Sequence, residues 1–240
     1  MKKIPTLSII IPVYNEEAFI KKTIEKVLKA DSLELKKEII VVEDGSTDDT
    51  TKILKRIQKK YGMLITVIFK RHNEGKGEAL KTGFLNSSGD IVLIQDSDLE
   101  YNPDDYPLLL EPFIKNDADV VYGSRFISNR PHRVLYYWHY VANLFLTMLS
   151  NMFTLLNLTD METGFKVFKG KLIRQIAPEL KSKKFGFEPE ITARISKIKN
   201  LKIYEVGISY WGRTYEDGKK IGWKDGIRAI GEIIRFNLFD

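Results

Sequence analysis

Three carboxylates stand close together near the middle of the chain, directly after a short apolar run. Residues 91–94 are all aliphatic and predict a buried strand. Asp96 and Asp98 follow it, one residue apart, and Glu100 stands two residues further on. Side chains at positions i and i+2 point the same way, so these three can converge. Carboxylates gathered at one point need a cation, and hard oxygen ligands suit Mg²⁺ or Mn²⁺.

A solvated acidic turn is the alternative interpretation of these residues. It is the better one for an isolated D-x-D motif, because so short a pattern often matches by chance. The position after a strand favours the metal site instead, since open α/β sheets bind ligands at the carboxyl ends of their strands. The sequence therefore predicts that Asp96, Asp98 and Glu100 hold a divalent metal.

The composition narrows the class of protein and its partners. The chain has 240 residues, a net charge of +6 and no cysteine. Its basic charge favours anionic partners such as phosphate esters, anionic lipid or nucleic acid. The lack of cysteine excludes disulfides and thiolate zinc sites and fits a cytoplasmic location. We see no signal peptide, because no long apolar segment follows the first lysines. One domain, residues 1–240, is the simplest interpretation.

Strands and helices alternate through the first half. Strands are predicted at 7–13, 38–43, 64–70, 91–95 and 119–123. Helices are predicted at 16–30, 78–86 and 103–115, and a further helix follows the turn at 44–49 and ends near residue 61. Asn15 is the expected N-cap of the first helix. This order predicts an α/β fold with a mostly parallel sheet flanked by helices. The loops at its carboxyl edge would carry Tyr14, Glu16, Asp44, residues 73–76 and the three carboxylates.

The second half is less regular. Residues 134–159 carry no charge if His139 is neutral, and their length alone would allow a membrane span. Polar residues recur there every three or four positions, which instead predicts an amphipathic helix pair in the core or on a membrane surface. Strands follow at 165–169 and 203–210, and a helix begins near Pro189. A basic amphipathic helix at 223–236 fits a protein surface or an anionic membrane.

Several familiar motifs are absent. No G-x-x-x-x-G-K-[ST], G-x-G-x-x-G or G-x-S-x-G occurs, which argues against a P-loop NTPase, a dinucleotide site and a serine hydrolase. The histidines, His72, His132 and His139, form no cluster that could ligate a metal. Asp44 stands in a Gly-Ser-Thr turn, where it could cap the next helix or bind a nucleobase.

Taken together, the motifs resemble those of family 2 glycosyltransferases with the GT-A fold, and within them the dolichyl-phosphate mannose synthase group. The resemblance covers nearly the whole chain. It is carried by residues 10–16 (IIPVYNE), 42–48 (VEDGSTD), 73–77 (NEGKG), 96–100 (DSDLE), 123–126 (GSRF), 163–168 (TGFKVF) and 209–213 (SYWGR).

The resemblance implies a role for each matching residue. The nucleotide-sugar residues would be Pro12, Tyr14, Glu16, Asp44 and Lys76. Asp96 and Asp98 would hold the metal, with Glu100 at a place where the family often has glutamine. The acceptor phosphate would bind Arg125 and either Arg130 or Arg133, and Arg213 would reach the donor diphosphate. Residues 1–124 would then form the nucleotide-sugar half and 125–240 the acceptor half.

The implied reaction moves mannose or glucose from GDP-mannose or UDP-glucose to a polyprenyl phosphate, with inversion. Such an enzyme would lie on the cytoplasmic face of a membrane. Many relatives continue into transmembrane helices, which we do not find here, so a membrane-protein partner stays open. The alternative acceptor is a sugar hydroxyl, for which Asp160 or Glu162 would be the base. A nucleic-acid-binding module is disfavoured, because the carboxylates would repel a polyanion unless metal were bound.

Overall fold

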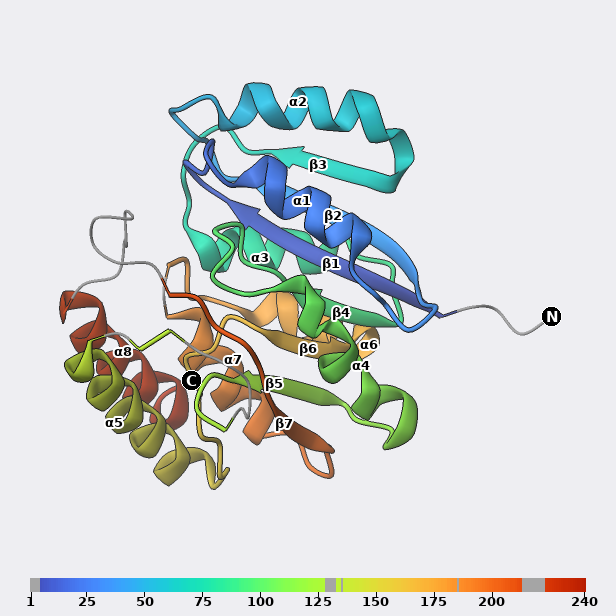
Figure 1. Cartoon of the computed structure of the whole chain (residues 1–240). Helices are drawn as coiled ribbons and strands as arrows, with labels where there is room; N and C mark the ends of the chain where they lie inside the picture. Colours follow the sequence, from blue (N-terminus) through green and yellow to red (C-terminus); the bar gives the residue numbers. More distant parts are fainter. Residues whose placement is uncertain (1–4, 128–132, 135, 185, 213–222) are drawn as a thin grey trace.

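One seven-stranded sheet runs through the molecule, in the order β3-β2-β1-β4-β6-β5-β7 (Figure 1). The computed structural model describes residues 5–127, 133–134, 136–184, 186–212 and 223–240. Its strands are β1 (Thr6–Val13), β2 (Lys36–Glu43), β3 (Ile65–Phe69), β4 (Ile91–Ile94), β5 (Val120–Ser124), β6 (Lys166–Lys169) and β7 (Ile203–Gly207). All neighbours pair in parallel except β6, which is antiparallel to β4 and β5. The predicted mostly parallel α/β sheet is confirmed.

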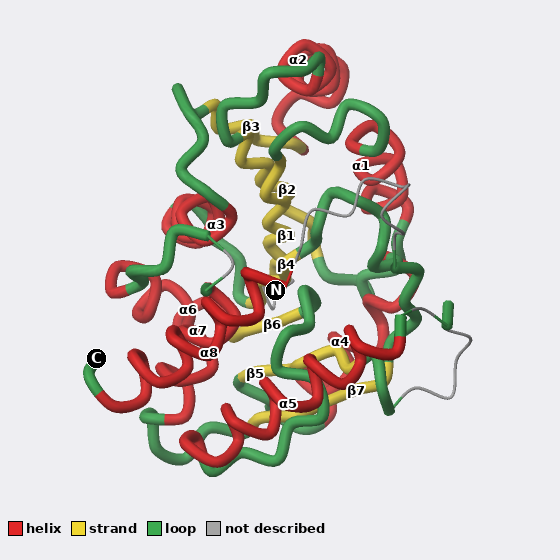
Figure 2. The backbone as a smooth tube through the Cα atoms, turned by 90° about the vertical axis from the view of Figure 1, so that its left-hand side faces the viewer, coloured by secondary structure: helices red, strands yellow, loops and turns green. Residues whose placement is uncertain are grey.

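Helices cover both faces of the sheet, which Figure 2 shows nearly edge-on. One face packs against α1 (Ile20–Lys29), α2 (Thr50–Tyr61) and α4 (Tyr106–Lys115). The other packs against α3 (Lys76–Leu85), α5 (Tyr137–Thr154), α6 (Gly170–Ile176), α7 (Phe187–Ser196) and α8 (Trp223–Leu238). Short 3₁₀ turns lie at Gly62–Leu64, Pro103–Asp105 and Ala177–Glu179.

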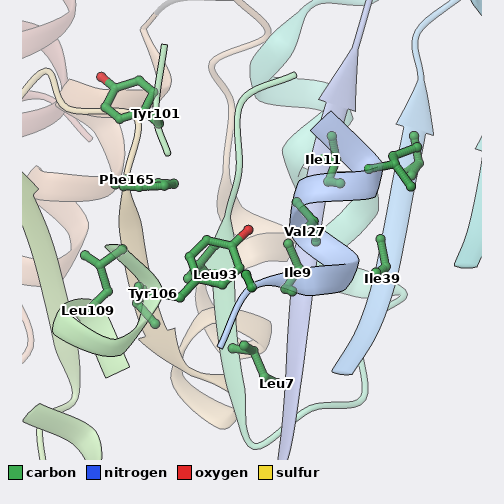
Figure 3. Packing of buried hydrophobic residues seen from close by; sticks show 14 of the residues in the cluster. Leu7, Ile9, Ile11, Val27, Ile39, Leu93, Tyr101, Tyr106, Leu109 and Phe165 are labelled. Carbon is green, nitrogen blue, oxygen red and sulfur yellow. The ribbon is translucent and has the colours of Figure 1, made fainter. Parts of the chain in front are cut away.

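The central strand β1 is buried on both faces, as its continuous apolar run predicts. Ile9 and Ile11 pack into one core with Val27 of α1 and Leu93 of β4, as Figure 3 shows. Ile10 points the other way, into the second core. Two cores on one sheet hold its carboxyl edge rigid, and that edge carries the predicted site.

The start of the first helix differs from the prediction. Helix α1 begins at Ile20 rather than at residue 16, and its N-cap is Phe19. Asn15 is not the cap: it adopts a left-handed backbone with φ of 52°, and its side chain accepts a hydrogen bond from the Thr47 N–H at 2.8 Å. A tertiary contact between two loops has therefore replaced the local cap.

The second half departs further from its predicted elements. Helix α6 was not predicted, and β7 ends at Gly207, so that Tyr210 only forms an isolated bridge with Tyr101. Pro189 is the third residue of α7 and not its first. Residues 134–159 contribute one helix, α5, because Leu155 ends it in a left-handed conformation. No described helix is long and apolar enough to cross a membrane.

Candidate active site

Loops at the carboxyl ends of β1 and β2 lie together and carry the predicted nucleoside residues. Pro12 is buried in β1 opposite Val42 of β2, Tyr14 is half-buried, and Glu16 is buried. The Glu16 N–H donates to the Thr50 hydroxyl of α2 at 2.9 Å, which ties the two loops together. The structure thus brings these residues to one edge, and nucleoside binding stays a prediction for them.

Asp44 serves the glycine-rich loop and not the helix that follows it. Its buried carboxylate accepts the Gly75 N–H at 2.7 Å and the Glu74 N–H at 3.1 Å. Gly75 has φ of 101°, and a Cβ there would overlap the backbone carbonyl of Lys183. Only glycine fits both requirements. Asp44 and Gly75 together fix the start of α3, and so the position of Lys76.

The Lys76 ammonium group lies between two carboxylates from distant parts of the chain. It is 3.0 Å from Asp96 at the end of β4 and 3.0 Å from Glu188 in the first turn of α7. Burial alone lowers the pKa of Lys76, but the two carboxylates outweigh it and raise that pKa well above its usual value. Lys76 therefore stays charged. Its partner Glu188 was not predicted, because the two residues are far apart along the chain.

Asp96 and Asp98 are the carboxylates that fit a divalent cation. Both are half-buried at the carboxyl end of β4, where a metal could take two carboxylates and complete its shell with phosphate and water oxygens. Lys76 already lies beside Asp96 and supplies one positive charge there. Asp96 and Asp98 as ligands stay predictions that the donor set supports.

The structure does not bring the predicted third carboxylate into this group. Among the described residues, no three Asp, Glu or His side chains form a metal-binding cluster. Oε2 of Glu100 instead accepts a hydrogen bond from the Tyr210 hydroxyl at 2.8 Å, and the Glu100 N–H donates to Asp98 at 3.1 Å. The turn at Leu99, with φ of 63°, explains why simple i, i+2 geometry fails here.

Arg125 is anchored at the end of β5 by Asp160. Its Nε and Nη2 donate to the two carboxylate oxygens at 2.6 and 2.7 Å, and its backbone N–H adds a third bond. Burial lowers the pKa of Arg125, but Asp160 outweighs it and raises that pKa well above its usual value. Asp160, expected as one of two possible bases, is fully buried and bound to Arg125. An anchored guanidinium is well suited to bind a phosphate.

Tyr210 connects the two predicted parts of the site. The Arg125 guanidinium lies 5.2 Å from the centre of its ring, and its hydroxyl binds Glu100. Arg133 lies beside it: its N–H donates to the Tyr210 carbonyl at 3.2 Å, and its Nη1 to the Gly212 carbonyl. Tyr210 therefore contacts both Arg125 and Arg133. Arg130 and Arg213 lie outside the described residues.

The half-buried Glu162 and the buried Lys166 influence each other's ionisation, which the sequence did not indicate. Burial raises the pKa of Glu162 to about 8, with a contribution from Glu188, and burial lowers the pKa of Lys166 to about 8. Lys166 donates to the carbonyls of Met161 and Thr163, so its ammonium group holds the loop that contains Glu162.

The raised pKa of Glu162 predicts a pH dependence of stability. The folded protein keeps the Glu162 proton up to a pH of about 8, whereas an ordinary glutamate releases it near 4.5. Between these values the folded state binds more protons, so stability falls as pH rises. Wild type should therefore lose stability relative to Glu162→Gln between about pH 5 and about pH 8. Urea unfolding of both proteins checks this.

Glu111→Gln is the matched control, because it makes the same change at a surface carboxylate of α4 that pairs with Lys115. Its unfolding should follow wild type across the same pH range. If the Glu162→Gln protein also showed an unchanged pH profile, the raised pKa would be wrong.

Known proteins with related sequences or structures identify the family. The family model described as glycosyl transferase family 2 matches residues 8–177. An uncharacterised protein of Methanocaldococcus jannaschii is 33% identical over an alignment 247 residues long, gaps included, that covers 95% of this chain and 97% of that protein. A dolichyl-phosphate beta-glucosyltransferase of Dictyostelium discoideum is 29% identical over 252 residues, 97% of this chain and 74% of that protein.

A solved structure agrees with the fold. Glucosyl-3-phosphoglycerate synthase from Mycobacterium tuberculosis, in complex with Mn²⁺, UDP and glucosyl-3-phosphoglycerate, superposes with a TM-score of 0.72 at 21% identity. The match covers 97% of this chain and 80% of that one. The chain therefore belongs to glycosyl transferase family 2, has the GT-A fold, and is a glycosyltransferase similar to the dolichyl-phosphate sugar synthases.

Proposed function

We propose that this enzyme transfers a hexose, with inversion, from a nucleoside-diphosphate sugar to the phosphate of a polyprenyl phosphate. The observation that carries the proposal is the Arg125 guanidinium, which Asp160 holds at the same edge as the predicted metal ligands. Relatives from Dictyostelium discoideum and Trichomonas vaginalis are dolichyl-phosphate beta-glucosyltransferases. UDP-glucose is therefore the first donor to test, and GDP-mannose the second.

On this proposal residues 1–124 bind the donor and 125–240 the acceptor. Pro12, Tyr14, Glu16 and Asp44 would surround the nucleoside, and the Lys76 ammonium group would stand beside the diphosphate. Asp96 and Asp98 would hold Mg²⁺ or Mn²⁺, which stabilises the negative charge that develops on the leaving diphosphate. The Lys76–Glu188 ion pair joins the two halves.

The acceptor chemistry needs no strong base. A phosphate monoester is already an anion near neutral pH, because its second pKa is about 6. One of its oxygens forms a bond to the anomeric carbon while the bond from that carbon to the diphosphate oxygen breaks, and the electron pair leaves with the nucleoside diphosphate. A single displacement of this kind inverts the anomeric centre. Arg125 would hold the attacking phosphate, since Nη1 is not used in its bonds to Asp160.

A lipid acceptor also accounts for the orientation of α5. The polar residues Thr147 and Ser150 face inward, with 3% and 1% of their surface exposed, whereas Met148 and Met152 are 54% and 68% exposed. An apolar face turned outward fits a membrane surface better than water. Helix α8 packs beside α5. We therefore place the enzyme on the cytoplasmic face of a membrane, with or without a membrane-protein partner.

A transfer screen tests the proposed reaction. UDP-glucose, GDP-mannose and UDP-N-acetylglucosamine would each be incubated with a short polyprenyl phosphate, in Mn²⁺ or in EDTA. We expect one donor to transfer its sugar to the lipid phosphate only with metal, and NMR of the first product to show inversion. Transfer to a soluble sugar hydroxyl but not to lipid phosphate would contradict the proposal and favour the alternative acceptor.

Arg125→Lys tests the acceptor site and keeps a positive charge beside the buried Asp160 carboxylate. Lysine cannot form two parallel bonds, so we expect the KM for polyprenyl phosphate to rise about tenfold to a hundredfold. Donor binding should change by no more than about twofold. Arg194→Lys is the matched control, because Arg194 is equally buried and binds Glu190 and Glu179 away from the site. Unchanged acceptor kinetics in Arg125→Lys would refute the assigned role.

Met152→Glu tests membrane contact through α5. A charge on the outward apolar face should reduce cosedimentation with anionic lipid vesicles at least about tenfold, because burial of that side chain is lost. Met63→Glu is the control, since Met63 is fully exposed in the turn before β3. Equal vesicle binding by the two variants would show that α5 does not contact the membrane.

A further inference from the structure

A short loop, residues 160–164, links the two ends of the candidate active site. At one end Asp160 holds Arg125. At the other, Gly164 packs so tightly on Asp96 that a Cβ would overlap its carboxylate, and the Gly164 N–H donates to the Tyr101 hydroxyl at 2.8 Å. The loop therefore spans the space between the predicted metal ligand and the predicted acceptor site.

Glu162 lies in the middle of this loop and has no role in the proposed transfer to a phosphate. Lys166, fully buried in β6, holds the loop from below through the carbonyls on either side of Glu162, those of Met161 and Thr163. Oε1 of Glu162 is buried and has no hydrogen-bond partner among the described residues. The residue as a whole is only half-buried. A buried polar atom without a partner is costly, so its retention calls for a ligand.

The charges around Glu162 restrict what that ligand can be. The surrounding cluster contains four carboxylates and three cations: Asp96, Asp160, Glu162 and Glu188 against Lys76, Arg125 and Lys166. Lys76 serves both Asp96 and Glu188, and Arg125 serves Asp160. Glu162 is the carboxylate that no described hydrogen bond reaches. The pKa of Glu162, raised to about 8 by burial, keeps it protonated near neutral pH, so the other three carboxylates balance the three cations. A neutral hydrogen-bonding group therefore satisfies the oxygen better than an ion would.

The reaction places such a donor at this position. In a transfer from a diphosphate to a phosphate, the sugar must lie between its leaving group and its nucleophile. Its hydroxyl groups are neutral and donate hydrogen bonds. We propose that Glu162 accepts a hydrogen bond from one hydroxyl of the transferred sugar and so helps select the donor, with Lys166 as its positioning residue. This inference rests on the donor and acceptor positions of the proposed function.

Donor analogues that lack single hydroxyls test the contact. Binding of UDP-glucose, GDP-mannose, their 2-, 3-, 4- and 6-deoxy forms, and UDP or GDP alone would be measured by calorimetry with Mn²⁺ and no acceptor. We expect Glu162→Ala to weaken binding of the cognate nucleotide sugar about tenfold to a hundredfold, the effect of leaving a buried hydroxyl of the sugar without its hydrogen-bond partner. Binding of the nucleoside diphosphate alone should stay within about twofold.

One deoxy donor should identify the partner hydroxyl. Wild type should bind that analogue as weakly as Glu162→Ala binds the parent nucleotide sugar. Glu162→Ala itself should bind the analogue and the parent with equal affinity. Glu162→Gln preserves the shape and an acceptor oxygen, so it should keep more affinity than the alanine variant. Glu111→Ala is the control on α4, and thermal unfolding of each variant shows whether it is folded.

Three results would overturn the inference. Equal weakening of the nucleoside diphosphate and the nucleotide sugar would show that Glu162 acts through the loop alone. An equal effect of Glu162→Ala on every deoxy donor would show that no hydroxyl contacts it. Normal donor binding by Glu162→Gln with transfer lost would make Glu162 a base.

Failure of the proposed function gives a different result. Donor binding that depends on Glu162, without any transfer to lipid phosphate, would overturn the lipid acceptor and leave the sugar contact in place. If no nucleotide sugar bound to wild type, both proposals would fail.

Discussion

The ammonium group of Lys76 is the charge on which the organisation of this site depends. Asp96 ends a central strand and Glu188 begins a helix far along the chain, and their carboxylates can approach only because Lys76 lies between them. A carboxylate at this depth without a cation would face a large desolvation penalty. The position of Lys76 in turn requires Gly75 in a left-handed conformation and Asp44 to bind its N–H. These residues at the carboxyl edge of the sheet are thus connected to one another through direct contacts.

Helix α5 follows the opposite rule from an ordinary surface helix. Its small polar residues Thr147 and Ser150 face the protein, and the Thr147 hydroxyl accepts the Met161 N–H at 3.1 Å, which holds the loop of Glu162. Leu146 joins the core, but other large apolar residues, among them Met148 and Met152, are exposed. The same helix therefore supports the active-site loop on its inner side and offers an apolar surface on its outer side. A lipid substrate would unite these two features, since its head must reach Arg125 while its chain avoids water.

The sequence predicted the sheet well, because continuous apolar runs such as residues 91–94 leave little choice of structure. It also placed Asp96, Asp98 and Arg125 just after strands at the edge where parallel strands end, and the structure has them there, while their roles stay predictions. It missed the partners that arise from tertiary contact: Glu188, Tyr210 and the outward face of α5. A polar stripe shows that a helix has two different faces but does not show which face packs against the protein. The spacing of Asp96, Asp98 and Glu100 likewise does not reveal the positive φ at Leu99, which turns Glu100 away.

The two predicted ends of the site contain different ionic groups, and one short loop joins them. The predicted donor end gathers Asp96 and Glu188 around the Lys76 ammonium group, and the predicted acceptor end holds the Arg125 guanidinium against Asp160. The loop 160–164 contacts both, through Gly164 on Asp96 and through Asp160 on Arg125. A displacement requires nucleophile and leaving group at a fixed separation and in line, and misplacement of about 1 Å can cost about a hundredfold in rate. If the proposed function holds, a loop this short, held from below by Lys166, would set that separation with little freedom to vary.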